Sequence, residues 1–336
     1  MMMRAECFDA IHFVRKLSLR KLLNYTCVRL SFCFSVVLGR SKHTGRPVSL
    51  SIEPTTACGL SCPECPSGLK QFTRPRGMMA MKDFAKIVDQ TGKRLIYLTL
   101  YFQGEPILNP NIYGMINYAH QKGIYTATST NGQDLSDENA RRLVESGLDR
   151  LIISMDGTDQ ETYEKYRIGG DVEKVKEGIK NIARWKHELG SRKPYVIIQF
   201  LVLKTNEHQI PAMKKLSKEL EADKLQLKAA QVYNFEKDTE MIPDHPKYAR
   251  YVRGADACWE LKKPIRNRCF RMWSGAIVTW DGRVVPCCFD KDADHQMGKL
   301  ENLTFQEIWK GKKYKEFRSQ ILENRSRIEI CRNCSE

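Results

Sequence analysis

The sequence predicts an α/β protein: a partial (β/α)6 barrel of the TIM type, followed by a small C-terminal unit made of a β-hairpin and a helix. Between residues 48 and 233, six apolar strand-like runs alternate with amphipathic helical segments, and the alternation stops beyond Tyr233. Strands that alternate with helices lie parallel in one sheet and are joined by right-handed crossovers. With 336 residues, of which 42% are hydrophobic, the chain can form such a domain and a smaller appendage.

The expected elements of the barrel follow one another in order. The strands are expected in the run that begins at Val48 and then over 95–102, 124–129, 150–157, 195–203 and 224–232. The helices are expected over 81–94, 112–122, 137–146, 160–166, 172–189 and 209–220. The run over 95–102 is apolar on both faces, which is typical of a buried parallel strand. Barrel enzymes carry their chemistry at the C-terminal ends of such strands, so the residues there are the candidate site.

The first 47 residues carry much of the positive charge. The net charge of the chain is +15, and this segment has nine Lys or Arg against Glu6 and Asp9, giving 9 − 2 = +7. The basic residues are interleaved with Leu, Tyr and Phe, a pattern that could form an amphipathic helix at an anionic membrane surface. A pair of helices packed on the outside of the catalytic domain is the alternative. No nucleic-acid partner is expected, because no known reader motif accompanies the charge.

Cysteine usage indicates metal binding. The chain has twelve cysteines, too many for an ordinary cytosolic enzyme and too sparse for a disulfide-stapled secreted domain. Seven fall into two groups, and the remaining five are expected to be buried apolar fillers: Cys7, Cys27, Cys33, Cys258 and Cys288. The apolar run from Cys27 to Leu38 contains Arg29 and lacks a small-residue cleavage site, so no cleavable signal is expected. The same run is too short to span a bilayer.

The first cysteine group is Cys58, Cys62 and Cys65, spaced C-x3-C-x2-C after the first strand. Three such thiolates can hold three irons of a cubane cluster and leave the fourth iron open. A tetrahedral zinc site normally needs a fourth ligand nearby, and the sequence offers none there. Three structural cysteines or a zinc knuckle remain the alternatives for this group.

This spacing, together with the motifs that follow it, resembles the radical S-adenosylmethionine (SAM) superfamily. In that family the open iron chelates the amino and carboxylate groups of SAM. An electron from the cluster then cleaves SAM to a 5′-deoxyadenosyl radical, which abstracts hydrogen from the substrate. The resemblance implies a [4Fe–4S] cluster, SAM, and a reductant such as flavodoxin or ferredoxin. Because an open cluster needs reduced thiolates, we expect a cytoplasmic enzyme, with membrane association through residues 1–47 as an open alternative.

The second strand ends in Gly104-Glu105-Pro106, which resembles the superfamily's Gly-Gly-Glu motif that receives the SAM ammonium group. A buried carboxylate facing a cation is a sound arrangement for this purpose. Gln103 stands where the first glycine is usual, and the loop could instead be a turn capped by its Glu.

Further candidates for SAM contacts follow the next two strands. Ser129 and Asn131 end the third strand, and Ser154 and Asp156 end the fourth, where they could bind the ribose hydroxyls or the methionyl carboxylate. Ordinary turn residues bonded to their own backbone are the alternative. Arg167 lies in a stretch that resembles the place where related enzymes put an arginine on the SAM carboxylate. A solvent-facing arginine is the alternative there.

The second cysteine group lies in the C-terminal unit. Two apolar runs split by Asp281-Gly282 predict a hairpin, and Thr304 with Glu307 predicts a capped helix that carries Phe305, Ile308, Trp309 and Phe317 inward. Hairpin, helix and the terminal C-x2-C bring four cysteines together: Cys269, Cys287, Cys331 and Cys334. Cys288 could replace Cys287, because neighbouring side chains on a strand point to opposite faces.

This arrangement resembles the shortened SPASM domain called twitch, which binds one auxiliary [4Fe–4S] cluster with all four irons ligated by cysteine. A zinc ribbon held by the same residues is the alternative. The predicted organisation is therefore a basic N-terminal segment (1–47), a radical SAM partial barrel (48–233), a linker and candidate lid (234–265), and an auxiliary cluster domain (266–336).

A fully ligated second cluster cannot chelate substrate, so its expected role is to accept an electron from a substrate radical. The predicted function is the net oxidation of a hydroxylated small molecule, sugar-like or lipid-linked. A peptide- or protein-modifying SPASM maturase is one alternative, although no leader-binding domain of about 80 residues fits into 1–47. A redox-neutral epimerase and a non-catalytic iron–sulfur or zinc-binding interaction protein are the others.

Overall fold

The computed structural model describes residues 2–233, 235, 241–254 and 258–335. Its centre is a nine-stranded sheet in the order β11-β10-β9-β1-β2-β3-β4-β5-β6. The strands β1 to β6 are Ser49–Ile52, Tyr97–Thr99, Tyr125–Thr130, Arg150–Ser154, Tyr195–Val202 and Lys224–Ala229. All pairs among them are parallel, for example Ala127 beside Arg150 between β3 and β4. The predicted six-stranded partial barrel is therefore confirmed.

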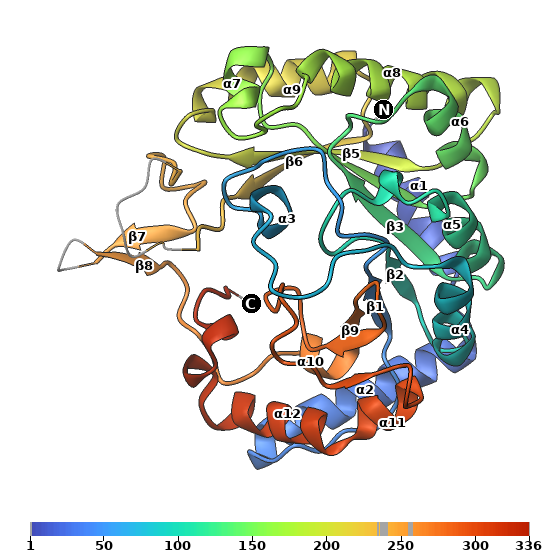
Figure 1. Cartoon of the computed structure of the whole chain (residues 1–336), viewed down its shortest axis with the longest axis vertical. Helices are drawn as coiled ribbons and strands as arrows, with labels where there is room; N and C mark the ends of the chain where they lie inside the picture. Colours follow the sequence, from blue (N-terminus) through green and yellow to red (C-terminus); the bar gives the residue numbers. More distant parts are fainter. Residues whose placement is uncertain (1, 234, 236–240, 255–257, 336) are drawn as a thin grey trace.

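Helices cover the outside of this curved sheet (Figure 1). Those that follow β2 to β5 on this outer side are α4 (Met81–Thr91), α5 (Ile112–Gln121), α6 (Asp137–Glu145), α7 (Gln160–Glu164), α8 (Val172–Glu188) and α9 (Ile210–Glu219). The short helix α3 (Pro66–Leu69), which follows β1, lies within the curve of the sheet instead (Figure 1). Alternate residues of the strands, such as Leu98, Ile153 and Ile198, are fully buried against these helices. The intervening residues face the interior of the barrel, where the sheet carries polar side chains.

The C-terminal unit continues the barrel sheet. Strand β9 (Gly275–Val278) pairs parallel with β1, and β10 (Arg283–Val285) and β11 (Gly298–Lys299) add antiparallel strands beyond it. The predicted hairpin is present, with Gly282 at φ +79° in its turn. The predicted capping box at Thr304 is also present, but the helix is interrupted at Gly311, giving α11 (Phe305–Lys310) and α12 (Lys312–Asn324).

The segment 234–265 was expected to be a linker without regular strands, because its sequence is polar and contains proline. Its described part contains two short antiparallel strands, β7 (Tyr251–Arg253) and β8 (Trp259–Leu261), so that expectation was wrong there. Residues 234, 236–240 and 255–257 lie outside the described residues. The proposed lid role of this segment remains a prediction, as do the four domain boundaries.

The N-terminal segment forms two helices that pack on the rest of the protein. Helix α1 (Met2–Arg15) brings Asp9 to the floor of the barrel, where its carboxylate accepts hydrogen bonds from the Tyr125 hydroxyl and the Arg150 guanidinium. Helix α2 (Leu19–Leu38) packs against the short helix α10 (Arg271–Ser274) of the C-terminal unit. The segment therefore has the arrangement of the alternative prediction, in which two helices pack on the outside of the catalytic domain.

Helix α2 is longer than the apolar run recognised in the sequence. In the described part of the chain it is the one helix with the length and apolar composition needed to cross a membrane. The expectation that this region is too short to span was therefore wrong on length, because the helix begins eight residues before Cys27. The expectation that the five cysteines outside the two groups are buried was also wrong. Cys7, Cys27, Cys33 and Cys258 are exposed, and Cys288 is half-buried.

Candidate active site

The first cysteine group lies on the loop between β1 and α3, at the C-terminal end of the barrel. Cys62 is buried, and Cys58 and Cys65 are half-buried. The Cys58 sulfur accepts a hydrogen bond from the Leu60 N–H at 3.5 Å, and the Asn131 amide lies 3.8 Å from it. These donors would stabilise a thiolate, because a charged sulfur accepts hydrogen bonds more strongly than a thiol does.

Burial makes these thiols hard to ionise on their own. Desolvation raises the pKa of Cys62 to about 11 and also raises the pKa of Cys58. A metal that replaces the proton overcomes this cost, and its binding releases the protons. In the described residues no three His, Cys, Asp or Glu side chains are arranged to hold a single metal ion.

The loop after β2 packs directly on the cysteine loop. The Gly104 N–H donates to Ser67 Oγ at 2.9 Å, and the Glu105 N–H donates to the Ala57 carbonyl at 2.7 Å. Gly104 has φ +72°, and a Cβ there would lie 2.4 Å from the Thr55 carbonyl oxygen. Only glycine allows this close approach, so the second glycine of the motif is required by the backbone.

Glu105 places a carboxyl group in the interior with no cation beside it. The residue is 2% exposed. Its carboxylate oxygens accept hydrogen bonds from the Asn131 N–H at 2.7 Å and the Ile107 N–H at 3.2 Å. Among the described residues it forms no salt bridge. Desolvation raises the pKa of Glu105 to about 7, although the Asn131 N–H acts in the opposite direction. A ligand ammonium group would supply the missing positive charge.

The candidates at the ends of β3 and β4 have different surroundings. Ser129 is half-buried and Ser154 is buried, and among the described residues neither hydroxyl has a hydrogen-bond partner. Both hydroxyls are therefore available for a ligand. Asn131 joins the two loops, since its N–H donates to Glu105 and its side chain reaches Cys58.

Asp156 and Arg167 form an ion pair instead of standing apart. Arg167 Nε lies 2.6 Å from Asp156 Oδ2, and the Arg167 Nη1 atom lies 3.9 Å from the Cys62 sulfur. The Asp156 side chain is fully buried and also accepts the Leu201 N–H at 2.6 Å. The structure therefore does not leave Asp156 open to a ligand, and we assign it the role of orienting Arg167. The alternative of a solvent-facing Arg167 does not describe this geometry.

The four cysteines of the second group line one small cavity: Cys269, Cys287, Cys331 and Cys334. Cys288 does not line it. Its sulfur instead lies 3.5 Å from Arg271 Nη1, on the side of a larger cavity. The expected choice of Cys287 over Cys288 is thus the one that brings four thiols together, although both cysteines follow the end of β10 and do not lie on a strand.

A buried arginine missed in the sequence completes this second group. Arg325 is 1% exposed, and one of its terminal nitrogens lies 2.8 Å from the Cys334 sulfur. Its charge also acts on Cys269 and Cys331. A buried cation beside several thiols fits a site of anionic thiolate ligands, since each charge offsets the other in the interior. No sequence signal distinguishes Arg325, because it lies in a stretch rich in Arg and Glu.

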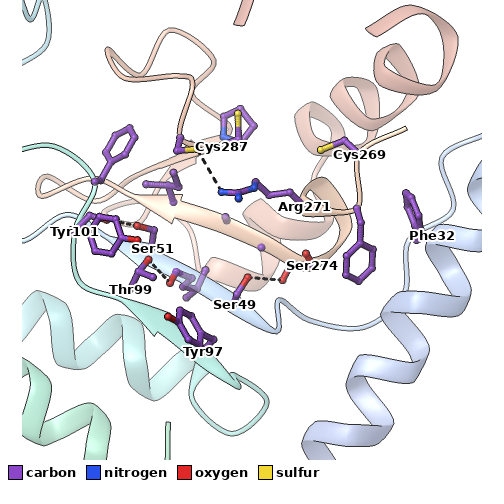
Figure 2. Close-up of a pocket in the computed structure, with 18 of the residues that line it drawn as sticks. Phe32, Ser49, Ser51, Tyr97, Thr99, Tyr101, Cys269, Arg271, Ser274 and Cys287 are labelled. Atoms are coloured by element: carbon purple, nitrogen blue, oxygen red, sulfur yellow. Dashed lines mark hydrogen bonds between the residues drawn. The ribbon is translucent and has the colours of Figure 1, made fainter. Parts of the chain in front are cut away.

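The larger cavity has a volume of about 850 Å³ and lies between the barrel and the C-terminal unit. Polar residues line it: Ser49 and Ser51 of β1, Tyr97 and Thr99 of β2, and Tyr101 in the loop after β2. Lys228, near the end of β6, lines it as well. Cys269 and Cys287 line it as well as the small cavity, so they form part of the wall between the two. Figure 2 shows Cys287 and Cys269 along the upper edge of this pocket and Phe32 at the right, on the same side as Cys269.

Comparisons with known proteins agree with this geometry. The sequence matches the radical SAM superfamily over residues 52–216 and the SPASM iron–sulfur cluster-binding domain over residues 269–335. A tungsten-containing aldehyde ferredoxin oxidoreductase cofactor-modifying protein of Pyrococcus furiosus is 28% identical over 315 residues, which are 85% of this chain and 86% of the relative. A PqqA peptide cyclase of Gluconobacter oxydans is 24% identical over 283 residues, covering 78% of this chain and 76% of the cyclase.

Two solved structures share the fold. Streptococcus suis SuiB bound to S-adenosylmethionine superposes with a TM-score of 0.62 at 16% identity, covering 82% of this chain and 68% of SuiB. BtrN in complex with AdoMet and 2-DOIA superposes with a TM-score of 0.53 at 16% identity, covering 88% and 95% of the two chains. The protein is thus a cluster-dependent enzyme built on a partial barrel. It belongs to the radical SAM superfamily and carries a C-terminal SPASM domain, so its cofactors are [4Fe–4S] clusters and SAM.

Proposed function

We propose that the enzyme removes two electrons from a hydroxylated small molecule bound in the 850 Å³ cavity, as a radical SAM dehydrogenase. The observation that carries this proposal is the shared wall of the two cavities. Cys269 and Cys287 line both the substrate cavity and the small cavity of the second cysteine group. An electron acceptor held by these cysteines would lie next to the substrate, which is what a net oxidation requires.

The residues fit the cofactors that the family uses. Cys58, Cys62 and Cys65 would hold the SAM-binding cluster, and the second group with Arg325 would hold the auxiliary cluster in its shortened, twitch-like form. Gly104 and Glu105 would receive the SAM ammonium, Arg167 its carboxylate, and Ser129, Asn131 and Ser154 its polar groups. When bound, these cofactors supply a 5′-deoxyadenosyl radical that removes a hydrogen atom from the substrate, and an acceptor for one electron from it.

The lining of the cavity supports a polar substrate. Five hydroxyl-bearing residues of β1, β2 and the adjoining loop line it. The hydroxyls of Ser49, Ser51 and Thr99 donate to backbone carbonyls, so they can act as acceptors toward sugar-like hydroxyls. Lys228 lies at the inner face of β6, and no carboxylate of the described residues forms a salt bridge with it. Burial lowers the pKa of Lys228, while Cys288 and Asp156 act in the opposite direction. We assign Lys228 the uptake of the substrate proton or the binding of an anionic group on the substrate.

Product mass is the measurement that tests this proposal. The anaerobically reconstituted enzyme is incubated with SAM, dithionite and pools of carbohydrates, lipid-linked sugars and peptides. Oxidation gives a product lighter by two hydrogen atoms, and Cys331→Ala/Cys334→Ala should abolish that product while SAM cleavage continues. A product of unchanged mass that exchanges hydrogen with solvent would identify a redox-neutral epimerase instead. A physiological reductant such as flavodoxin or ferredoxin should replace dithionite.

A second candidate is the modification of a peptide, which the similarity to PqqA peptide cyclase favours. The same cavity could receive one side chain of an extended peptide. Turnover of a peptide that depends on a leader sequence, with no turnover of carbohydrate, would select this candidate over the first.

A further inference from the structure

We propose that the outward face of helix α2 binds an anionic lipid surface and holds the enzyme there as a peripheral membrane protein. This inference does not depend on the reaction proposed above. It starts from an inversion of the usual pattern of a surface helix, which places its apolar stripe toward the core. In α2 the residues buried against the protein are Lys21, Asn24, Val28, Ser31 and Ser35, and four of these five are polar.

The face of α2 that points away from the protein is apolar. Leu19 is 73% exposed, Leu23 59%, Leu30 53%, Phe34 60% and Val37 81%. Their spacing of four, seven, four and three residues places them on one side of the helix. Single exposed apolar residues are common on proteins, but a continuous stripe of this length normally marks an interaction surface.

The buried polar residues tie α2 to the catalytic domain at one point and to the chain segment that follows the helix at two others. Lys21 Nζ donates to the Gly123 carbonyl at 2.7 Å. Asn24 pairs with the backbone of Arg46 at 2.9 and 3.0 Å, and Ser35 exchanges hydrogen bonds with the backbone of Lys42 at 2.6 and 2.9 Å. Crossing a bilayer would break the bond from Lys21 to Gly123 and place the charged and polar side chains of this face in hydrocarbon. The helix is therefore suited to lie in the plane of the membrane, although its length would allow it to cross.

The charge around α2 identifies the partner as an anionic surface. Five basic residues on and beside the helix are exposed: Arg15, Arg20, Arg29, Arg40 and Lys42. The sequence has no Asp or Glu between Asp9 and Glu53. An apolar stripe flanked by Lys and Arg is the pattern of helices that lie at lipid headgroups. A second copy of this chain is the weaker candidate, because it would bring the same positive charges together across the interface.

The same helix reaches the large cavity from its other side. Phe32 lines that cavity and packs edge-on against Phe270 and Trp273, with ring centroids 5.3 Å apart in both cases. Figure 2 shows Phe32 on α2 at this edge of the cavity. A lipid surface under α2 would therefore lie beside the cavity, with one helix between them.

Binding to vesicles tests the proposal with the full-length, cluster-loaded enzyme. Vesicles of phosphatidylcholine with phosphatidylglycerol are compared with vesicles of phosphatidylcholine alone by sedimentation. We expect binding to the anionic vesicles that weakens in high salt. The variant Leu23→Gln/Leu30→Gln should bind at least about tenfold more weakly, because two leucines no longer enter the apolar layer. The control Leu189→Gln/Leu303→Gln changes two other exposed leucines and should bind as the unmodified enzyme does.

Three results would overturn the proposal. The first is equal vesicle binding by Leu23→Gln/Leu30→Gln and the unmodified enzyme, or no binding by either. The second is a membrane-bound fraction from cells that resists high pH and needs detergent for release, which would show a spanning helix. The third is a dimer in light scattering that the variant loses, which would assign the stripe to self-association. Thermal unfolding and the visible absorbance of the clusters confirm that each variant is folded, since changes at exposed positions have small effects on stability.

Discussion

Arg74 and Glu53 form a buried, two-point ion pair that joins three parts of the molecule. The distances are 2.8 Å between Arg74 Nη1 and Glu53 Oε2 and 2.5 Å between Arg74 Nη2 and Glu53 Oε1. Glu53 follows β1 immediately and also accepts the Trp280 N–H of the hairpin at 3.1 Å. Arg74 Nε donates to the Lys291 carbonyl at 3.0 Å. The pair therefore fixes the loop after the first cysteine group to the unit that carries the second.

Removing one partner of this pair should destabilise the whole protein. We expect Arg74→Met to lower the free energy of unfolding by about 3 to 5 kcal/mol, because the Glu53 carboxylate is then buried without its cation. Chemical denaturation under anaerobic conditions measures this change. Arg76→Met, at an exposed position two residues away, should change the value by less than about 0.5 kcal/mol. Equal losses in the two variants would contradict the assignment.

The neighbouring cysteines of the hairpin should differ in iron content. The reconstituted enzyme should hold about eight irons, as two [4Fe–4S] clusters require. Cys287→Ala should reduce this number to about four, whereas Cys288→Ala should leave it unchanged, because Cys287 lines the cavity of the other three thiols and Cys288 does not. The triple variant Cys58→Ala/Cys62→Ala/Cys65→Ala should also retain about four irons but lose SAM cleavage. Loss of iron from Cys288→Ala, with none from Cys287→Ala, would show that Cys288 and not Cys287 is the cluster ligand.

The barrel could be predicted because its signal is local. Each strand is a short apolar run, each helix has its own periodicity, and the parallel order follows from their alternation. The pairing of β9 with β1 could not be predicted, since Gly275 and Ser49 are 226 residues apart and neither strand indicates its neighbour. Which face of α2 is buried could not be predicted either. Most of the buried residues of this helix are polar, and several of its leucines are exposed.

The residues of the site also fall into those that could be predicted from the sequence and those that could not. Cysteine spacing and the glycine that needs a positive φ are visible in the sequence, because chain geometry dictates them. The partners of Asp156, Glu53 and Cys334 are not visible, because they come from distant segments. A charged residue directly after a barrel strand was the available signal for Glu53, since that edge carries the chemistry. Its ion pair with Arg74 needed the folded loop.

SAM affinity should depend on the protonation of Glu105. The pKa of this carboxyl is raised to about 7 by burial, so below that pH it is neutral in the protein without SAM. A neutral carboxyl cannot attract the SAM ammonium, so affinity should rise as the pH increases from about 6 to about 7.5, by at most about tenfold per unit. Anaerobic titration of SAM into the cluster-loaded enzyme measures the dissociation constant at each pH.

The variant Glu105→Gln separates this effect from other titrations. Glutamine keeps an oxygen that can accept a backbone N–H but carries no charge. SAM should therefore bind more weakly to the variant at every pH, and the rise between about pH 6 and about pH 7.5 should disappear. If the variant keeps the rise, another group is responsible for it and Glu105 does not receive the ammonium.

Arg325 should set the reduction potential of the auxiliary cluster. Its guanidinium is buried beside Cys334, and its charge acts on Cys269 and Cys331. A positive charge close to the ligand sulfurs stabilises the reduced cluster, which carries one more negative charge. Removing a unit charge at roughly 5 Å, with an effective dielectric constant of about 20, corresponds to a shift on the order of 100 mV.

We therefore expect Arg325→Met to lower the potential of the auxiliary cluster, measured by redox titration with electron paramagnetic resonance, while the potential of the SAM-binding cluster stays the same. Arg327→Met is the matched control, because Arg327 lies in the same short 3-10 turn (Arg325–Arg327) but is exposed. In Arg325→Lys the reduction potential of the auxiliary cluster should stay close to that of the unmodified enzyme, since lysine keeps the charge. A variant that assembles both clusters with unchanged potentials would show that Arg325 serves only packing. The oxidation should slow with the fall in potential, because the substrate radical then has a weaker electron acceptor.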